Sequence, residues 1–202
     1  MNRKTNMNIL TIILALAFSL SVAFGQNETI VKQNRIVSTI DSTYNNEIVL
    51  IQELTVNVPL DSVWNAYTSK RGWESWAVAI AEIDLKVGGY IKTNYNANGK
   101  IGDSTTIVTH IINYVPKKLI TLQAEITENF PEFMKKESKD FYNVIYFEEK
   151  ENGVTNVKSY GIGYKNTEKY LSLMKYFIQA NEMSLMNLIK YLETGEKIKR
   201  NL

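Results

Sequence analysis

The fold of this chain is decided by residues 167–193 near its end, which have the sequence TEKYLSLMKYFIQANEMSLMNLIKYLE. Apolar side chains recur there every three or four residues, a spacing that places them on one face of a helix. These residues are Leu171, Met174, Ile178, Leu185, Leu188 and Leu192. Asn181 is the one polar residue in this stripe. We therefore expect a single amphipathic helix of about 27 residues, roughly 40 Å long, which can cross a small domain.

The segments before this helix have the pattern of an antiparallel sheet. Residues 47–58 alternate, with Leu50, Leu54 and Val56 on one face, as in a half-buried strand. Two short helical segments are expected next, over about 60–76. Further strands are expected around Gly88-Gly89, over 103–114, 117–126 and 141–149, and up to Tyr164. The expected fold class is α+β, with about six to seven antiparallel strands, two short helices after the first strand and the long helix on the sheet.

The first 25 residues have the layout of a secretory signal peptide. Arg3 and Lys4 form a basic start, residues 9–22 are almost continuously apolar, and the small residues of Ala23-Phe24-Gly25-Gln26 favour cleavage between its last two members. The alternative is an uncleaved membrane anchor, but the apolar run is shorter than the roughly 20 residues of a spanning helix. No cysteine follows that could carry a lipid. We expect an exported protein, periplasmic or extracellular, with no stable membrane anchor after cleavage.

Charge and composition exclude several partners. Removing the signal takes away two of the 23 basic residues and none of the 21 acidic ones, so the remaining chain has no net charge. Nucleic-acid binding usually requires a strong basic excess, so no such partner is expected. The absence of cysteine excludes disulfides and thiolate metal sites. The expected organisation is a flexible leader at 26–45, one domain at 46–195 and a basic tail at 196–202.

Three local patterns follow one another along this domain. The first is VWNAYT at 63–68, and the second is Trp76 followed by DLKVGGY at 84–90 and VPKKL at 115–119. The third is the strand end GIGY at 161–164, followed by Phe177, Asn181, Leu185, Leu188 and Gly195. In order and spacing, the chain resembles the SRPBCC or START-like superfamily, and more narrowly its branch named after the activator of heat-shock-protein-90 ATPase.

The resemblance implies a helix-grip fold, in which the sheet and the terminal helix enclose a pocket for a small apolar or amphipathic molecule. Some members bind lipids, hormones or polyketides, and a few catalyse cyclisation or hydrolysis. The residues expected at such a pocket are Trp73, Trp76, His110, Tyr146, Tyr160, Met174, Phe177, Ile178 and Asn181. No cofactor and no metal are expected. The chaperone-stimulating activity in the name of this branch is hard to reconcile with an exported protein.

His110, the single histidine, has two interpretations. Imidazole titrates near neutrality, so His110 could act as an acid or base in the cavity together with tyrosines. The tyrosines considered are Tyr142, Tyr146 and Tyr160. We favour the alternative, a hydrogen-bonded structural histidine. On a regular strand it would share a face with Val108, Ile112 and Tyr114.

Other candidate residues also have structural interpretations. Asn181 either contacts a bound polar group or water, or ties the helix to a neighbouring strand, which we favour. Trp73 and Trp76 are more often core than ligand contacts, and Gly161 and Gly163 are expected to permit close backbone approach. We favour an exported binding protein over a cyclase- or hydrolase-type enzyme and over a ligand-free partner-binding module. A large exposed apolar patch would favour the last of these.

Overall fold

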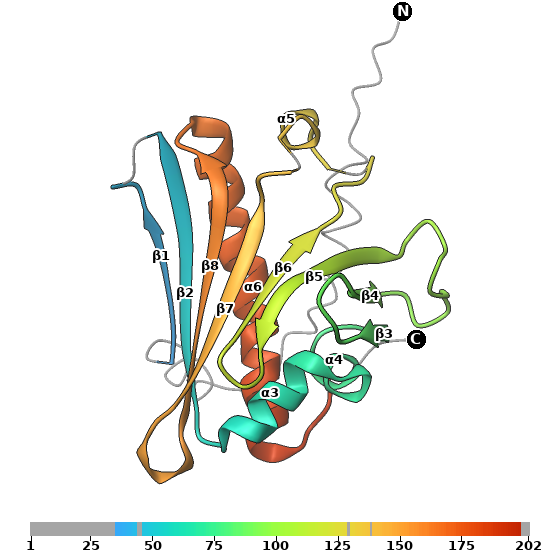
Figure 1. The fold of residues 1–202 in the computed structure, drawn as a ribbon, viewed down its shortest axis with the longest axis vertical. Coiled ribbons are helices and arrows are strands. Elements are labelled where there is room, and N and C mark those ends of the chain that lie inside the picture. The colour runs from blue at the N-terminus through green and yellow to red at the C-terminus, as the bar shows by residue number, and fades with distance from the viewer. Residues whose placement is uncertain (1–34, 44–45, 129, 138, 199–202) are drawn as a thin grey trace, which may run out of the picture.

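The structure is a computed structural model of the chain that describes residues 35–43, 46–128, 130–137 and 139–198. The described part folds around an antiparallel sheet of eight strands in the order β1-β2-β8-β7-β6-β5-β4-β3 (Figure 1). The strands are β1 Ile36–Asp41, β2 Glu47–Val56, β3 Ile80–Asp84, β4 Tyr90–Asn94, β5 Ile107–Val115, β6 Leu119–Ala124, β7 Tyr142–Glu149 and β8 Thr155–Lys165. The helices are α3 Leu60–Thr68, α4 Lys70–Trp76, α5 Glu132–Lys135 and α6 Glu168–Thr194, and η1 Glu151–Gly153 is a 3-10 turn.

The long terminal helix predicted from the apolar stripe is confirmed. α6 has 27 residues and ends at Gly195, whose φ of 76° is the left-handed conformation that commonly terminates a helix. It runs along one face of the sheet, with α3 and α4 beside its C-terminal half and α5 near its start (Figure 1). We call the sheet face that α6 covers the inner face and the opposite one the outer face. The expected α+β helix-grip fold, with two short helices after the long strand β2, is confirmed.

Two apolar clusters lie between the inner face and the helices. The first cluster fills the end of the sheet near α3 and α4, and it includes Trp76, Ile111, Ile145 and Leu188. The second cluster lies at the α5 end. Its buried members are Ile48, Leu50, Met134, Phe141, Tyr170 and Met174. Strand residues of both clusters alternate with outward-facing ones, the usual pattern of a sheet with one covered face.

The predicted flexible leader is wrong in its second half, because Ile36–Asp41 forms the edge strand β1, paired with β2. Its inward side chains account for this. Ile36 is buried in the first cluster and Ile40 packs against the second. The sheet therefore has eight strands, one more than the upper end of the expected range. Residues 26–34 and 44–45 of the leader and the predicted signal peptide lie outside the described residues. Within the described residues, no helix is long and apolar enough to span a membrane.

The end of β8 depends on a glycine that lies against another backbone segment. Gly163 has a φ of +88°, and a Cβ added there would lie 1.8 Å from the carbonyl oxygen of Asp140. No L-side chain fits this position without movement of the segment that enters β7. The predicted close backbone approach is confirmed here, and it fixes how β8 leads into α6.

Candidate functional site

The middle of the inner face, between the two apolar clusters, carries small or polar side chains. In each of five neighbouring strands the inward row has one residue of this kind, and together these residues follow a diagonal across the sheet. They are Gln52 of β2, Ser159 of β8, Asn143 of β7, Ala124 of β6 and Thr109 of β5, which we call the middle band. Gln52 pairs with Ser159, and Ala124 pairs with Thr109. Asn143 pairs with Gly161 and Leu122, so it lies diagonally beside Ser159 and Ala124 and not directly opposite them.

Solvent reaches the inner face at this level. Asn143 is exposed although its inward neighbours in β7, Phe141 and Ile145, are both buried. Thr109, Ala124 and Ser159 are each partly exposed. Because small side chains leave room where the flanking rows carry large apolar ones, the two clusters do not merge into a single core. The middle band is therefore a polar and partly exposed strip between the two apolar clusters.

Several polar groups in and above the middle band have no hydrogen-bond partner among the described residues. A Cβ added to Gly161 would lie 3.4 Å from Cε2 of Tyr164, so the Tyr164 ring lies directly over this part of β8. Burial raises the pKa of Tyr164 to about 12. Within the described residues, the Tyr164 hydroxyl, the Asn143 amide and the Ser159 hydroxyl make no hydrogen bond. They are available to water or to a polar group of a ligand.

Asn181 makes the tie between helix and sheet that we favoured from the sequence. Its Nδ2 donates to Oε1 of Gln52 at 2.8 Å, and Nε2 of Gln52 donates to Oγ of Ser38 in β1 at 3.0 Å. Gln52 is only 4% exposed, whereas Asn181 itself is exposed. The buried amide is thus on the strand, and the helix supplies its partner.

The other predicted α6 residues lie next to the middle band or deeper in the second cluster. Met174 is fully buried, and Phe177 and Ile178 pack beside it while remaining partly exposed. The Phe177 ring meets the Tyr164 ring edge-on, with centroids 6.4 Å apart. Phe177 and Ile178 therefore border the middle band, and Met174 belongs to the core.

Trp73 and Trp76 lie in the first cluster and connect the two short helices. Nε1 of Trp73 donates to the carbonyl of Tyr67 at 2.7 Å, and Nε1 of Trp76 donates to the carbonyl of Ala66 at 3.0 Å. The two indole rings lie 5.2 Å apart. The donated hydrogen bonds and the burial of Trp76 correspond to the core interpretation.

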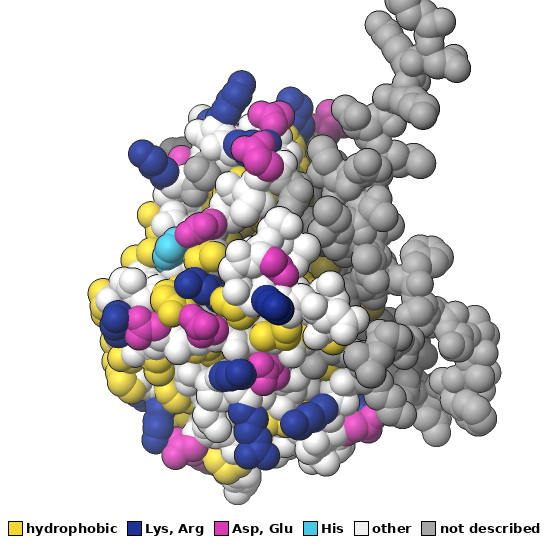
Figure 2. Space-filling view, turned by 90° about the vertical axis from the view of Figure 1, so that its right-hand side faces the viewer, with side chains coloured by type: hydrophobic (Ala, Val, Ile, Leu, Met, Phe, Trp, Pro, Cys, Tyr) yellow, Lys and Arg dark blue, Asp and Glu magenta, His cyan; other side chains and the backbone are white. Residues whose placement is uncertain are grey.

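His110 lies on the outer face, so the expectation that it lines the cavity is wrong. Its neighbour Ile111 is fully buried on the inner face, and adjacent strand residues point to opposite faces. His110 Nε2 lies 2.7 Å from Oε1 of Glu125, and both side chains are more than two-fifths exposed. Figure 2 shows the histidine at the molecular surface among hydrophobic side chains. The hydrogen bond that the favoured interpretation expects is present.

Tyr146 and Tyr160 also lie on the outer face, which corrects their placement at the pocket. Tyr146 alternates with the buried Ile145 and is 46% exposed, and its ring meets that of Tyr160 edge-on at 5.8 Å. Beside them, the ammonium group of Lys158 bonds Oε1 of Glu53 at 2.7 Å. Together with His110, these tyrosines are separated by the sheet from the predicted residues on α6. Tyr142 faces outward as well, since it alternates with Phe141 and Asn143.

Two surface depressions lie at the ends of α6 and not at its middle. One, of about 390 Å³, includes Lys165 and Glu137, and the other, of about 270 Å³, includes Lys190 and Glu196. In each depression these two charges pair, at 2.6 Å and 2.9 Å respectively. Lys165 and the Tyr170 hydroxyl also hold the pKa of Glu137 below its usual value. No group of three metal-binding side chains occurs in the described part of the chain.

The fold and this inner-face site define a class, the α+β helix-grip proteins. Within that class, the chain belongs to the family described as Activator of Hsp90 ATPase homolog 1-like protein, whose model matches residues 57–193. No curated protein matches the chain.

Solved structures with low sequence identity share the fold. CalU16 from Micromonospora echinospora is 16% identical, with a TM-score of 0.52 over 76% of this chain and 85% of that one. A conserved protein of unknown function from Enterococcus faecalis is 13% identical, with a TM-score of 0.54 over 82% of both chains. The Aha1 dimer from Colwellia psychrerythraea is 19% identical, with a TM-score of 0.52 over 73% of this chain and 97% of that one.

Proposed function

We propose that the chain is an exported member of this family that binds a small apolar or amphipathic molecule between the middle band and α6. The observation that carries the proposal is the exposed Asn143 between the buried Phe141 and Ile145 on the face that the helix covers. A solid core would have a large apolar residue at this level. The inward rows of the four neighbouring strands β2, β8, β6 and β5 each have one small or polar residue as well, along a diagonal through Asn143.

The chemistry of the surroundings favours a ligand with an apolar body and a polar group. The two clusters offer apolar walls through partly exposed residues of α6, Phe177 and Ile178 in the second cluster and Leu185 and Met186 in the first. Between them, the Tyr164 hydroxyl and the Asn143 amide are without partners among the described residues. A ligand pocket is typically apolar with a few polar groups that set orientation. Hydrogen bonds to these groups would offset the cost of removing them from water.

Two substitutions at adjacent positions of β7, one in the middle band and one on the outer face, test the proposal. Asn143→Phe fills the band, whereas Val144→Phe adds the same ring on the outer face of the same strand. With the full chain as recovered from cells and dansylated undecanoic acid as the probe, we expect Asn143→Phe to weaken binding at least tenfold and Val144→Phe less than twofold. Native mass spectrometry of the unmodified protein should show a bound small molecule. No probe binding together with no bound molecule, or equal effects of both variants, would overturn the proposal.

Export is supported by the sequence alone, through the basic start, the apolar run and the small residues before Gln26. The intact mass of protein recovered from the periplasm or medium should lack residues 1–25. Ala23→Arg places a large charged residue at a position that needs a small one, so the full-length mass should then accumulate. Recovery of the full-length unmodified chain from the cytoplasm would exclude export.

The alternatives differ in what supports them. The enzyme hypothesis has no acid–base residues left in the proposed site, because His110 and the three tyrosines face outward. A partner-binding module retains one supporting observation, the exposed apolar side chains outside the inner face. These are Val37, Val87, Val115 and Tyr146. A chain that carries no ligand and is indifferent to Asn143→Phe would favour this second candidate.

A further inference from the structure

On the β1 side, the sheet ends in a row of backbone groups that have no partner within the ranges that the structure describes. The N–H of Thr55 donates to the carbonyl of Arg35 at 3.2 Å, which fixes the phase of the β1–β2 ladder. Since antiparallel pairs alternate between bonded and non-bonded, Ile36, Ser38 and Ile40 turn their N–H and C=O groups away from β2. Within the described part of the chain, none of these outward groups makes a hydrogen bond.

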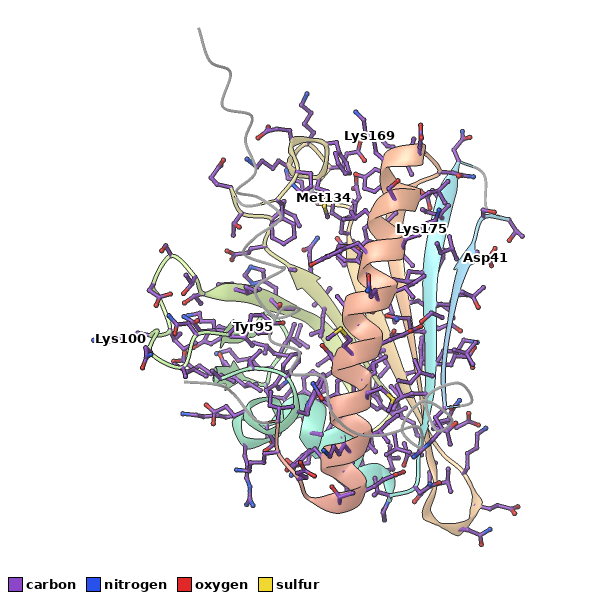
Figure 3. All side chains as sticks on the ribbon, turned by 180° about the vertical axis from the view of Figure 1, so that it is seen from behind. Asp41, Tyr95, Lys100, Met134, Lys169 and Lys175 are labelled. Carbon is purple, nitrogen blue, oxygen red and sulfur yellow. The ribbon has the colours of Figure 1, made fainter. Side chains whose placement is uncertain are left out.

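The opposite edge of the sheet, at β3, is covered, so the two edges differ in how accessible their backbone groups are to another strand. The N–H of Ala81 in β3 donates to Oε1 of Glu74 at 3.0 Å, and α4 packs against this strand. Natural edge strands are usually blocked by lysine, proline, a bulge or an inward charge. β1 has none of these over residues 36–40, which have the sequence IVSTI. Figure 3 shows Asp41 at this free side of the sheet.

We propose that β1 pairs with β1 of a second copy of this chain, antiparallel, with Ser38 facing its own counterpart on a twofold axis. In this register Ile36 faces Ile40 of the second copy. Each residue whose backbone N–H and C=O turn away from β2 therefore lies opposite another such residue. Each bonded pair exchanges two hydrogen bonds, giving about six across the contact. A shift of the register in either direction leaves at least one of these residues without a partner strand. The contact is isologous, as most dimer interfaces are.

Charge and burial both favour this occupant. The same register places Asp41 opposite Arg35 of the second copy, whose guanidinium also pairs with Glu193 of its own chain, so opposite charges lie near each other at each end of the contact. A parallel arrangement would instead bring the two Asp41 side chains together, and like charges directly opposite are destabilising. On the outer face, the 54% exposed Val37 comes beside Thr39 of the second copy. The result is one continuous sheet with both α6 helices on the same side.

This inference is independent of the proposed ligand site. β1 precedes the family-matched range of residues 57–193, so the pairing edge lies outside the family domain. Loss of pairing would leave the middle band intact, and loss of ligand binding would leave the edge intact.

A matched pair of substitutions at Ser38 tests the pairing. Ser38→Pro and Ser38→Ala both remove the hydroxyl that accepts from Gln52 at 3.0 Å, but only proline removes the outward N–H. Proline is tolerated on an edge strand where its nitrogen faces away from the ladder. In sedimentation equilibrium on the full chain as recovered from cells, we expect a dimer whose dissociation constant rises at least tenfold in Ser38→Pro and less than threefold in Ser38→Ala. A monomer throughout the concentration series, or equal dissociation constants for the two variants, would overturn the proposal.

Cross-linking gives a second measurement that does not depend on whether the proline variant folds. The chain has no cysteine, so the double substitution Val37→Cys, Thr39→Cys introduces the only thiols. These positions face each other across the twofold axis as non-bonded pairs, about 4.5 Å apart between Cα atoms, which is within the range of a disulfide. Mild oxidation should give a covalent dimer, whereas Glu149→Cys, on an exposed position far from β1, should give none above background. Equal cross-linking of both variants, or none in either, would exclude the β1 contact.

Discussion

Replacing Asn181 with leucine should destabilise the chain, although leucine is the more apolar residue. Gln52 is 4% exposed, and the amide of Asn181 is the donor to its side-chain oxygen. Removing that donor leaves a buried carbonyl without a partner, which costs about 1–3 kcal/mol. The new side chain recovers little of this loss, because position 181 is exposed.

The reverse substitution, Gln52→Leu, should cost less than Asn181→Leu. The amide of Asn181 can then bond water, as can the partly exposed Ser38 hydroxyl, and leucine completes the apolar row of Leu50 and Leu54. The double variant leaves no buried polar group stranded, so its stability should return to within about 1 kcal/mol of the unmodified chain. The coupling energy of the cycle is therefore about 1–2 kcal/mol.

Urea denaturation of the four proteins measures these free-energy differences directly, and thermal denaturation measures them as changes in Tm. In a chain of this size, about 1 kcal/mol corresponds to 2–4 °C in Tm, so Asn181→Leu should lower Tm by roughly 2–12 °C. A loss below about 0.5 kcal/mol with no coupling would show that Gln52 is satisfied without Asn181. A larger loss for Gln52→Leu than for Asn181→Leu would show that its bond to Ser38 dominates.

Two further predictions concern Glu193 near the end of α6 and the glycines at 163 and 195, which precede and follow this helix. Hydrogen bonds from Arg35, and then the Asn57 N–H, hold the pKa of Glu193 below its usual value. A depressed carboxyl pKa stabilises the fold above the unfolded value of about 4.3 and stops doing so as pH falls through the folded value. The stability difference between the unmodified chain and Glu193→Gln, measured by urea denaturation, should therefore be full at pH 7 and shrink below pH of about 4; a constant difference would contradict this. Gly163→Ala should cost more than Gly195→Ala in the same assay, because both have positive φ but an added Cβ meets nothing within 4 Å at Gly195; each carries about 1–2 kcal/mol of backbone strain, and equal losses would exclude the clash at Gly163.

Most of the fold could be predicted from local patterns in the sequence. The 3.6-residue period of the apolar stripe predicted α6 to within a residue at each end, and strand alternation predicted the order of elements. β1 was missed because its inward row has only Ile36 and Ile40 around a serine, within a polar stretch of sequence. Such a strand is ordered by pairing with β2, which depends on tertiary contacts.

The face of His110 could not be obtained by counting residues along β5. The regular alternation predicted one face for His110 and Tyr114, but the register with β6 shifts between Ile111 and Asn113. A bulge adds one residue and inverts the phase of everything beyond it. Tyr114 therefore packs against the first cluster while His110 faces outward, and no residue type at 111–113 announces the change.

The middle band shows why a site of this kind is hard to find in a single strand. A serine, an asparagine or an alanine in an inward row is unremarkable by itself, and Gln52 between Leu50 and Leu54 invites the interpretation of a local exception. The five positions acquire meaning only through the register, which places them along one diagonal across β2, β8, β7, β6 and β5. Because the large neighbours on both sides already make two separate cores, the band is not needed to fill either of them. Its members other than the buried Gln52 are therefore free to serve whatever lies between sheet and helix. Substitutions at Asn143, Ser159 or Thr109, more than at the tryptophans or the histidine, should therefore separate binding from folding.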